Sequence, residues 1–232
     1  MKSFTFIDKV ISVMYFTLYL PLLSLSVFPG ICLIFYTLDT TESLLPIFQI
    51  MIISVTISAT YLIHQIILPL FCGLIFQILP IRYPLGEFPL YSLNGAKWAI
   101  CNTLHRISRQ HFPTYLIPSW YTNLYYRMMG ADVSKEAHIN SLLINDPQHV
   151  SIGRGAIIGG GAIINSHSVE GDMLYLAKNN IGEKATVGLG SVLLSGACLD
   201  SYAILGARSF VSKNKIIPSG EIWAGAPAKK IR

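Results

Sequence analysis

Aliphatic residues recur at every sixth position in the C-terminal half of the chain. From Ile181 onward this phase holds seven aliphatic residues without a miss, and a small residue stands four positions after each of the first five. A period of six matches neither the about 3.6 residues of a helix turn nor the simple alternation of a strand, so it indicates repeats. The aliphatic positions are Ile181, Val187, Leu193, Leu199, Leu205, Val211 and Ile217, and the small ones are Ala185, Ser191, Ala197, Ala203 and Ser209.

This pattern predicts a parallel β-helix, in which six residues form a short strand and a turn and three such units form one coil of a triangular prism. The aliphatic side chain points into the prism, and the small one fits the crowded corner. The same period returns upstream at Ile152, Ile158 and Ile164, and more weakly at Val133 and Ile139. We therefore expect a prism over residues 131–222, roughly five coils, within a domain that covers residues 131–232.

One irregular segment interrupts the repeat. Ile164 and Ile181 are 17 residues apart, one short of three hexads, and the residues between them include His167 and Glu170. Departures from a regular pattern are where functional residues are usually inserted. This segment is therefore the first place to look for chemistry.

The N-terminal part of the chain contains two long apolar runs. Residues 10–38 and 44–81 contain no Asp, Glu, Lys or Arg, and each run exceeds the about 20 residues that cross a bilayer as a helix. A signal peptide is a poor alternative, because the first run is too long and a second follows it. Residues 1–81 are thus predicted to form two or more membrane segments. Proline could kink or divide the runs, at Pro21, Pro29 and Pro69, and the second run could hold a re-entrant pair.

Flanking charges predict how these segments are oriented. Lys2 and Lys9 precede the first run, whereas the short link between the runs carries Asp39 and Glu42 and no base. Basic residues are enriched on the cytoplasmic side of membrane segments, so both termini and the β-helix are expected on the cytoplasmic side of an inner membrane. The bases that follow the second run are Arg82, Lys97, Arg106, Arg109 and Arg127.

Residues 82–130 mix bases with aromatic side chains, a combination that suits the headgroup layer of an anionic leaflet. Ser119 could cap a helix over residues 120–129 that stops at Gly130. We expect interfacial linker helices here, and the alternative is a helix that packs on the first coil as a lid, with its aromatics as core. The net charge of +5 does not indicate a nucleic-acid partner, because the bases flank apolar runs and form no stripe.

His167 is the strongest candidate for catalysis. Imidazole titrates near neutrality and is the usual general base for a hydroxyl or amine, whereas a β-helix coil needs no histidine. His149 lies one full coil upstream, so the two rings are expected to stack on one edge of the prism. Glu170 could accept the second ring N–H of His167, or polarise the acceptor directly. For a lone histidine in a repeat protein, the alternative is a surface or interface residue.

Residues 131–232 resemble the hexapeptide-repeat, left-handed β-helix acyltransferases. The likeness rests on IGRGAIIGGGAIINSHSVEGD, on IGEKATVGLGSVLLSGACLDSYAILGARSFVSK, and on the closing WAGAPAKKIR. The apolar runs, YYRMMGADVS and HSVEGDMLYL also resemble the terminal membrane region of some non-ribosomal peptide and amino-acid polymer synthetases. The chain contains no adenylation or carrier domain, so this second likeness does not carry a synthetase role with it.

The resemblance implies a homotrimer with active sites between neighbouring prisms, His167 as base, and an acyl thioester along the coils. It also implies that coenzyme A meets Gly206 and Ala207 with its pantetheine arm and Ser212, Lys213 and Lys229 with its phosphates. HSVEGD is not the family's commonest form around the histidine, and the tail lacks the long extensions that often hold coenzyme A. The donor is therefore coenzyme A or an acylated carrier protein.

Three functions remain open. The first is a membrane-anchored acyltransferase that moves an acetyl or aminoacyl group from a thioester to a hydroxyl or amine at the inner membrane face, with lipid and a carrier protein or synthetase as partners. The second is a zinc enzyme of the carbonic anhydrase type, which needs a close histidine pair; His138, His149 and His167 are too far apart in the sequence, so no metal is expected. The third is a non-catalytic trimeric membrane assembly module.

Overall fold

A computed structural model describes residues 2–232, with the side chains of residues 12, 13 and 15–232. The chain divides into two compact units. The helical unit comprises Met1–Ile75 and Thr103–Pro113, and the β-helix unit comprises Phe76–Asn102 and Thr114–Arg232.

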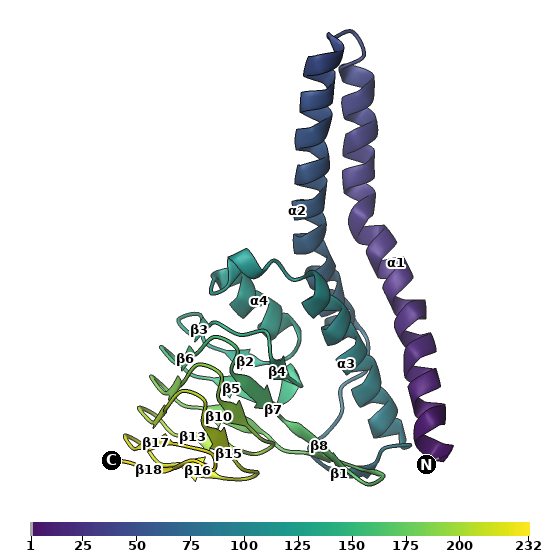
Figure 1. Cartoon of the computed structure of the whole chain (residues 1–232). Helices are drawn as coiled ribbons and strands as arrows, with labels where there is room; N and C mark the ends of the chain where they lie inside the picture. Colours follow the sequence, from purple (N-terminus) through teal and green to yellow (C-terminus); the bar gives the residue numbers. More distant parts are fainter. Residues whose placement is uncertain (1) are drawn as a thin grey trace. The chain divides into compact units, whose positions relative to one another are not determined.

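Both apolar runs form long continuous helices, α1 (Lys2–Thr40) and α2 (Pro46–Ile78) (Figure 1). Pro21 and Pro29 lie inside α1 and Pro69 lies inside α2, so proline divides neither run and α2 contains no re-entrant pair.

Two segments of these helices are long and apolar enough to cross a bilayer. They are Tyr15–Thr40, of 26 residues, and Pro46–Ile78, of 33 residues. The side chains of Lys2 and Lys9, on which the predicted orientation partly depends, lie outside the described side chains.

Small and hydroxyl-bearing residues join α1 to α2. A Cβ atom on Gly30 would lie 2.0 Å from Cγ2 of Thr60, so the missing side chain of Gly30 lets the two helices approach closely. The Thr60 hydroxyl donates to the Gly30 carbonyl at 3.3 Å, and the hydroxyls of Thr37 and Thr56 lie 3.2 Å apart. Phe16, in contrast, is 71% exposed. Small polar contacts between helices and large apolar side chains outside are typical of helices that face lipid.

Three parallel sheets form the three sides of the β-helix (Figure 1). The first sheet contains β2 (Asp132–Val133), β5 (Val150–Ile152), β10 (Asn179–Ile181), β13 (Cys198–Leu199) and β16 (Ile216–Ile217). The second contains β3 (His138–Ile139), β6 (Ile157–Ile158), β11 (Thr186–Val187), β14 (Ile204–Leu205) and β17 (Ile222–Ala224), with β18 (Lys229–Lys230) antiparallel at its edge. The third contains β4 (Ile144–Asn145), β7 (Ile163–Asn165), β12 (Val192–Leu193) and β15 (Phe210–Val211).

The predicted β-helix is confirmed by the register of these strands. From β10 onward, partners in neighbouring coils are separated by three hexads, as in the pairs Ile181–Leu199, Val187–Leu205 and Leu193–Val211. All seven aliphatic residues of the sixfold phase are buried, and so are the five small residues that follow them. The parallel sheets also fit the predicted left-handed form.

The interruption after Ile164 is an antiparallel hairpin. Ile164 pairs with Leu193, whereas three regular hexads would bring it to Gly182, so the residues in excess of one coil leave the winding. These residues include β8 (His167–Glu170) and β9 (Met173–Leu176), which pair with each other, while β9 also pairs with β1 (Gly86–Pro89). The segment is therefore one hexad plus an excursion, and not three shortened hexads.

Shorter helices connect α2 to the prism. They are α3 (Leu93–His111), η1 (Thr114–Leu116) and α4 (Trp120–Met128), and η2 (Pro147–His149) follows β4. The helix α3 is shared between the units: residues 93–102 belong to the β-helix unit, and residues 103–111 to the helical unit.

The helix α4 has the predicted capping and packs as a lid on the first coil. The Ser119 hydroxyl accepts a hydrogen bond from the Tyr121 amide at 3.2 Å, and Gly130 follows the helix with φ = 92°. The Tyr126 hydroxyl donates to the Ser141 carbonyl at 3.1 Å, and the Asn123 amide donates to the Ala137 carbonyl at 2.8 Å. These contacts match the lid alternative, and contact of the segment with lipid stays a prediction.

The inward stack supports a test with two neighbouring residues of β14. Leu205→Ala is expected to lower the free energy of unfolding by about 2–5 kcal/mol, because it removes a fully buried side chain and leaves a cavity. Its outward neighbour Ile204, 38% exposed, is the matched control, and Ile204→Ala is expected to cost about 1 kcal/mol or less. Urea unfolding of the full chain in detergent, followed by circular dichroism, measures both. Equal losses for the two variants would contradict the assigned register.

Candidate active site

His167 forms a short hydrogen bond with a carboxylate from the coil before it. Nδ1 of His167 lies 2.5 Å from Oδ2 of Asp146. The Asp146 side chain is fully buried, whereas that of His167 is 22% exposed. A partly exposed histidine held by a buried carboxylate is the arrangement of a general base.

Three further donors surround the Asp146 carboxylate. Its Oδ1 atom accepts hydrogen bonds from the Tyr83 hydroxyl at 3.0 Å, the Trp98 indole N–H at 2.9 Å and the Asn102 side-chain amide at 3.2 Å. Trp98 and Asn102 come from the first half of α3, one helical turn apart, and Tyr83 precedes β1. Four donors from three segments thus converge on one carboxylate, which satisfies its lone pairs away from water.

The backbone of Asp146 is left-handed, with φ = 54° and ψ = 59°. Aspartate adopts this conformation more readily than most residues, and Pro147 then begins η2. Residues in this region of the Ramachandran plot are concentrated at functional sites, where the surrounding structure holds them in place.

The Asp146 carboxyl is held in its charged form. Burial by itself would raise its pKa, but the hydrogen bond and charge of His167, together with the hydrogen bonds from Asn102 and Tyr83, outweigh burial and lower the pKa below its ordinary value. An ionised Asp146 requires a proton on Nδ1 of His167. Nε2 of a neutral ring then has a free lone pair for accepting a proton.

The second side of the His167 ring is packed against an aromatic side chain. The ring centroids of His167 and Trp98 are 5.1 Å apart, with the planes inclined at 70°. Trp98 therefore contacts both members of the pair, because its N–H binds Asp146 while its ring borders His167. This contact limits rotation of the imidazole and keeps Nδ1 directed at the carboxylate.

The prediction that Glu170 holds His167 is wrong, because Asp146 occupies that role. Glu170 lies at the far end of β8, where it is exposed and forms an ion pair with Lys213. Its other suggested role, polarising the acceptor, stays a prediction.

His149 does not stack on His167 one coil away. The winding is irregular here, because Val150, the residue after His149, pairs with Asn179, on the far side of the hairpin that contains His167. His149 is buried, and its ring packs edge-on against Tyr83 at 5.1 Å. Since Tyr83 donates to the site carboxylate, His149 supports the site from behind this phenol.

The predicted coenzyme A residues occupy separate places. The Gly206 amide donates to the Trp223 carbonyl at 2.7 Å, so this N–H belongs to the sheet and is not open to a pantetheine arm, which corrects the prediction. Ala207 is exposed on the following turn, and its role stays a prediction. Lys213 lies at the hairpin, where its ammonium is 5.7 Å from the Tyr175 ring centroid.

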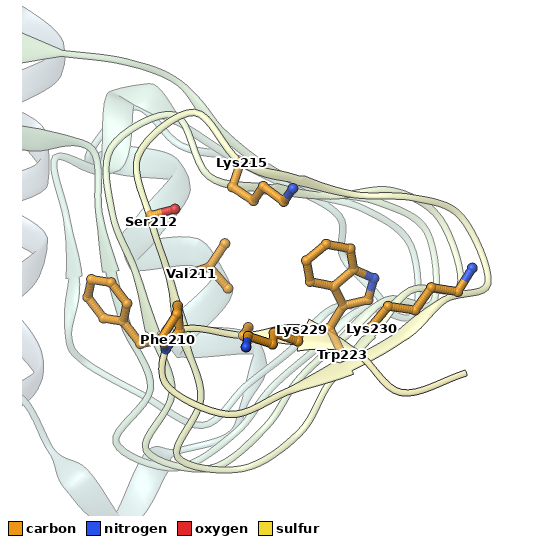
Figure 2. A pocket seen from close by; sticks show the side chains of 9 residues that line it. Phe210, Val211, Ser212, Lys215, Trp223, Lys229 and Lys230 are labelled. Atoms are coloured by element: carbon orange, nitrogen blue, oxygen red, sulfur yellow. The ribbon is translucent and has the colours of Figure 1, made fainter.

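Ser212 and Lys229 line one cavity of about 400 Å³ at the C-terminal end of the prism. Figure 2 shows Val211 and Trp223 pointing into the space that the last coil encloses. Trp223 takes the position opposite Leu205 and so covers the last layer of core. Lys215 and Lys230 also line the cavity, which makes this end of the prism cationic.

Sequence reasoning did not identify Asp146, Tyr83 or Asn102 as site residues. It treated the aromatic side chains of residues 82–130, which include Trp98, only as interfacial or as core of a lid. One signal was present for Asp146. The step from Ile139 to Ile152 is one position longer than two hexads, and Asp146 lies in that gap. Nothing in the periodicity marks the other three, since they come from segments outside the repeat.

No group of three or more His, Cys, Asp or Glu side chains that could hold a metal ion occurs among the described residues.

No protein-family model matches the chain. A curated relative is the delta-poly-L-ornithine synthetase of Acinetobacter baumannii (strain AB307-0294), which is 26% identical over 147 residues. The match covers 63% of this chain and 11% of that protein. The chain therefore spans a small part of this relative.

Several solved structures share part of the fold. A maltose O-acetyltransferase from Clostridium difficile 630 matches with a TM-score of 0.48 and 16% identity, over 63% of this chain and 92% of that chain. A galactoside acetyltransferase in complex with coenzyme A matches with a TM-score of 0.41 and 17% identity, over 63% and 85%. An acetyltransferase from Vibrio cholerae O1 biovar eltor, with hexapeptide repeats and in complex with acetyl coenzyme A, matches with a TM-score of 0.37 and 19% identity, over 42% and 60%.

The expected likeness to hexapeptide-repeat acyltransferases and to an amino-acid polymer synthetase is confirmed by these matches. At such TM-scores and identities they carry no argument about the reaction or substrate of this chain.

Burial of His149 predicts a pH dependence of stability. Burial lowers the pKa of His149 in the folded chain, with nearby Asp146 opposing part of that effect. The unfolded chain therefore binds a proton first as the pH falls, so the free energy of unfolding is expected to decrease below about pH 6.5. His149→Gln is expected to flatten this decrease between about pH 6.5 and 5, a range well above the pKa of Asp146.

His138→Gln removes an exposed imidazole of the same unit and serves as the control. Its free energy of unfolding is expected to change with pH as steeply as that of the wild type. Denaturant unfolding at a series of pH values measures the slopes. If His149→Gln kept the full wild-type slope, burial of His149 would not be its source.

Proposed function

We propose that the chain is a membrane-anchored acyltransferase, which moves an acetyl or aminoacyl group from a thioester to a hydroxyl or amine at the inner membrane face. The observation that carries this proposal is the 2.5 Å pair of His167 and buried Asp146. The pair stands at the base of the hairpin that interrupts the β-helix. A trimeric assembly module without catalytic function would have no need of such a pair.

His167 acts as the general base. Its Nε2 atom takes the proton of the acceptor O–H or N–H while the acceptor atom attacks the thioester carbonyl. The imidazolium that forms is stabilised by the Asp146 carboxylate, which stays ionised. When the tetrahedral intermediate collapses, the carbon–sulfur bond breaks and the imidazolium returns its proton to the leaving thiolate.

Asp146 positions the base and does not touch the substrate. The carboxylate favours the tautomer of His167 that carries its proton on Nδ1. The three other hydrogen bonds that Asp146 accepts keep the carboxylate from rotating away from the ring. Because Asp146 is fully buried, its attraction to an imidazolium is weakly screened by water.

The cationic cavity at the end of the prism is the proposed site for the phosphates of the donor. Lys229, Lys215 and Lys230 line it together with Ser212, and ammonium groups and a hydroxyl suit a polyanionic nucleotide end. Lys230 also binds Glu221 at 2.6 Å, so Lys229 and Lys215 are the freer charges. The same groups would meet the phosphate of a phosphopantetheine arm on a carrier protein.

A homotrimer would cover the apolar side chains that remain on the outside of the prism. Ile157, Leu189 and Ile216 are exposed at outward positions of the coils. A three-sided prism also suits cyclic threefold symmetry.

The helical unit is the proposed anchor. Its two candidate spans carry apolar side chains outward, and the acidic link between them contrasts with the bases that follow α2. This charge pattern supports an inner-membrane protein with the β-helix on the cytoplasmic side. The synthetase relative suggests ornithine or its polymer as one acceptor class to test.

Removal of the base tests this proposal. His167→Gln is expected to lower the transfer rate about 10²- to 10⁴-fold, because general base catalysis contributes that much. Asp146→Asn is expected to lower it as well, with the donor affinity unchanged. The full chain in lipid nanodiscs is given radiolabelled acetyl coenzyme A with a bacterial lipid extract, or with L-ornithine, and label in the product is counted.

His138→Gln, on β3, is the matched control and is expected to transfer at the wild-type rate. An active wild type whose His167→Gln variant kept most of its rate would overturn the assignment of the base. A wild type that transfers no label and is not stabilised by coenzyme A would favour the non-catalytic assembly module.

Donor binding is tested at the cavity. Lys229→Ala is expected to weaken coenzyme A binding about tenfold, because it removes one charge-assisted contact with a phosphate. Lys135→Ala, an exposed lysine between β2 and β3, is expected to leave the affinity unchanged. Isothermal titration of the full chain in detergent gives both dissociation constants. If Lys229→Ala bound coenzyme A as tightly as the wild type does, the phosphates would bind elsewhere.

A further inference from the structure

The helical unit contains a row of four hydrogen-bonded polar side chains between its apolar helices. The hydroxyl of Ser26 lies 2.7 Å from Nδ1 of His64, and Nε2 of His64 lies 3.0 Å from Nδ1 of His111. Nε2 of His111 lies 2.8 Å from the Tyr19 hydroxyl. Ser26 and Tyr19 belong to α1, His64 to α2 and His111 to the end of α3, so the row joins all three helices.

One end of this row is closed and the other is accessible. Ser26 is 1% exposed and His64 is 6% exposed, whereas Tyr19 and His111 are half-buried. Ionisable side chains inside apolar helices are costly and usually have a functional role. The proposed acyl transfer uses none of these four groups.

The donors and acceptors of the row form a consistent sequence with both rings neutral. The Ser26 hydroxyl donates to the Leu23 carbonyl at 2.8 Å, so its oxygen accepts the Nδ1–H of His64. Nε2 of His64 then accepts the Nδ1–H of His111, and Nε2 of His111 accepts the O–H of Tyr19. Every ring nitrogen has a partner, and the two imidazoles face each other through one hydrogen.

The surroundings of the pair contain bases and phenols but no carboxylate, among the described residues, that would hold a permanent charge. Besides the pair itself, the described titratable and charged groups of the three helices are as follows: Tyr15, Tyr19, Cys32, Tyr36 and Asp39 on α1, Tyr61 and Cys72 on α2, and Lys97, Cys101, His105, Arg106 and Arg109 on α3. The described carboxylates of the unit, Asp39 and Glu42, are at the opposite end of α1 and in the link that follows it. Burial lowers the pKa of His111 below its ordinary value, which favours the neutral ring.

We propose that His64 and His111 together form a binding site for one proton, loaded from the half-exposed end of the row. A hydronium ion gives its proton to Nε2 of His111, and the Tyr19 hydroxyl turns to accept the new N–H. The resulting positive charge is shared, because the proton between Nδ1 of His111 and Nε2 of His64 can lie on either nitrogen. The pair takes one proton and not two, since a second would place N–H groups on both facing nitrogens and break their hydrogen bond.

Histidine-selective ¹⁵N NMR of the full chain in nanodiscs, recorded from pH 8 to 4.5, tests this site. The expected result is a single titration step, below about pH 6.5, at which the ring signals of His64 and His111 move together. In His64→Gln, the His111 ring is expected to titrate as a single imidazole with a different midpoint. His138→Gln is the control and is expected to keep the shared step.

Tyr19→Phe tests the part that the Tyr19 hydroxyl plays in holding the proton, without removing either ring. It deletes the hydroxyl that accepts the new N–H of a charged His111, so the shared step is expected to move down by about one pH unit. Circular dichroism checks that each variant keeps its helices.

Two results would overturn the proposal. Independent titration of the two rings would show that they share no proton. Rings that stay neutral to pH 4.5 would show that the row only fastens the three helices together. The proposed acyl transfer does not use this site, so either result would leave the proposed function of His167 unchanged.

Discussion

The inward stack of aliphatic side chains constrains every other residue of the β-helix. Each coil must place one aliphatic residue over the next, so residues in register are three hexads apart and alternate residues point outward. A segment that does not fit this spacing cannot remain in the wall of the prism. The extra residues after Ile164 therefore leave as a hairpin, and His167 stands where the chain leaves the coil. The position of the candidate base is thus a consequence of how the core is packed.

Burial of a carboxylate requires donors, and the β-helix unit supplies them from outside the repeat. Burying Asp146 unpaired would cost roughly several kcal/mol, but four hydrogen-bond donors offset that cost and keep it ionised. Repeats of aliphatic and small residues have no such groups to offer. The segment that contains β1 and the first half of α3 provides the indole, amide and phenol that the prism lacks. This segment is therefore part of the site and not only a link between units.

The histidines of the two units have different hydrogen-bond partners. In the β-helix unit, one histidine faces a carboxylate, so a proton on the ring is stabilised by a fixed negative charge. In the helical unit, two histidines face each other and a hydroxyl group binds the outer nitrogen of each ring, so the neutral state satisfies every ring nitrogen. The first arrangement suits proton transfer during a reaction. The second suits uptake of a proton as the pH falls.

The amino-acid sequence by itself determined the β-helix, because a period of six repeated over many coils reports directly on which side chains face the core. It also determined the two long helices and the interruption that contains His167. The partner of that histidine was decided only by the tertiary structure. Glu170, near it in sequence, is carried to the far end of the hairpin, while Asp146, from the coil before, is brought within 2.5 Å. Periodicity specifies burial residue by residue, whereas contacts between segments far apart in the chain depend on how those segments pack, which no local pattern encodes.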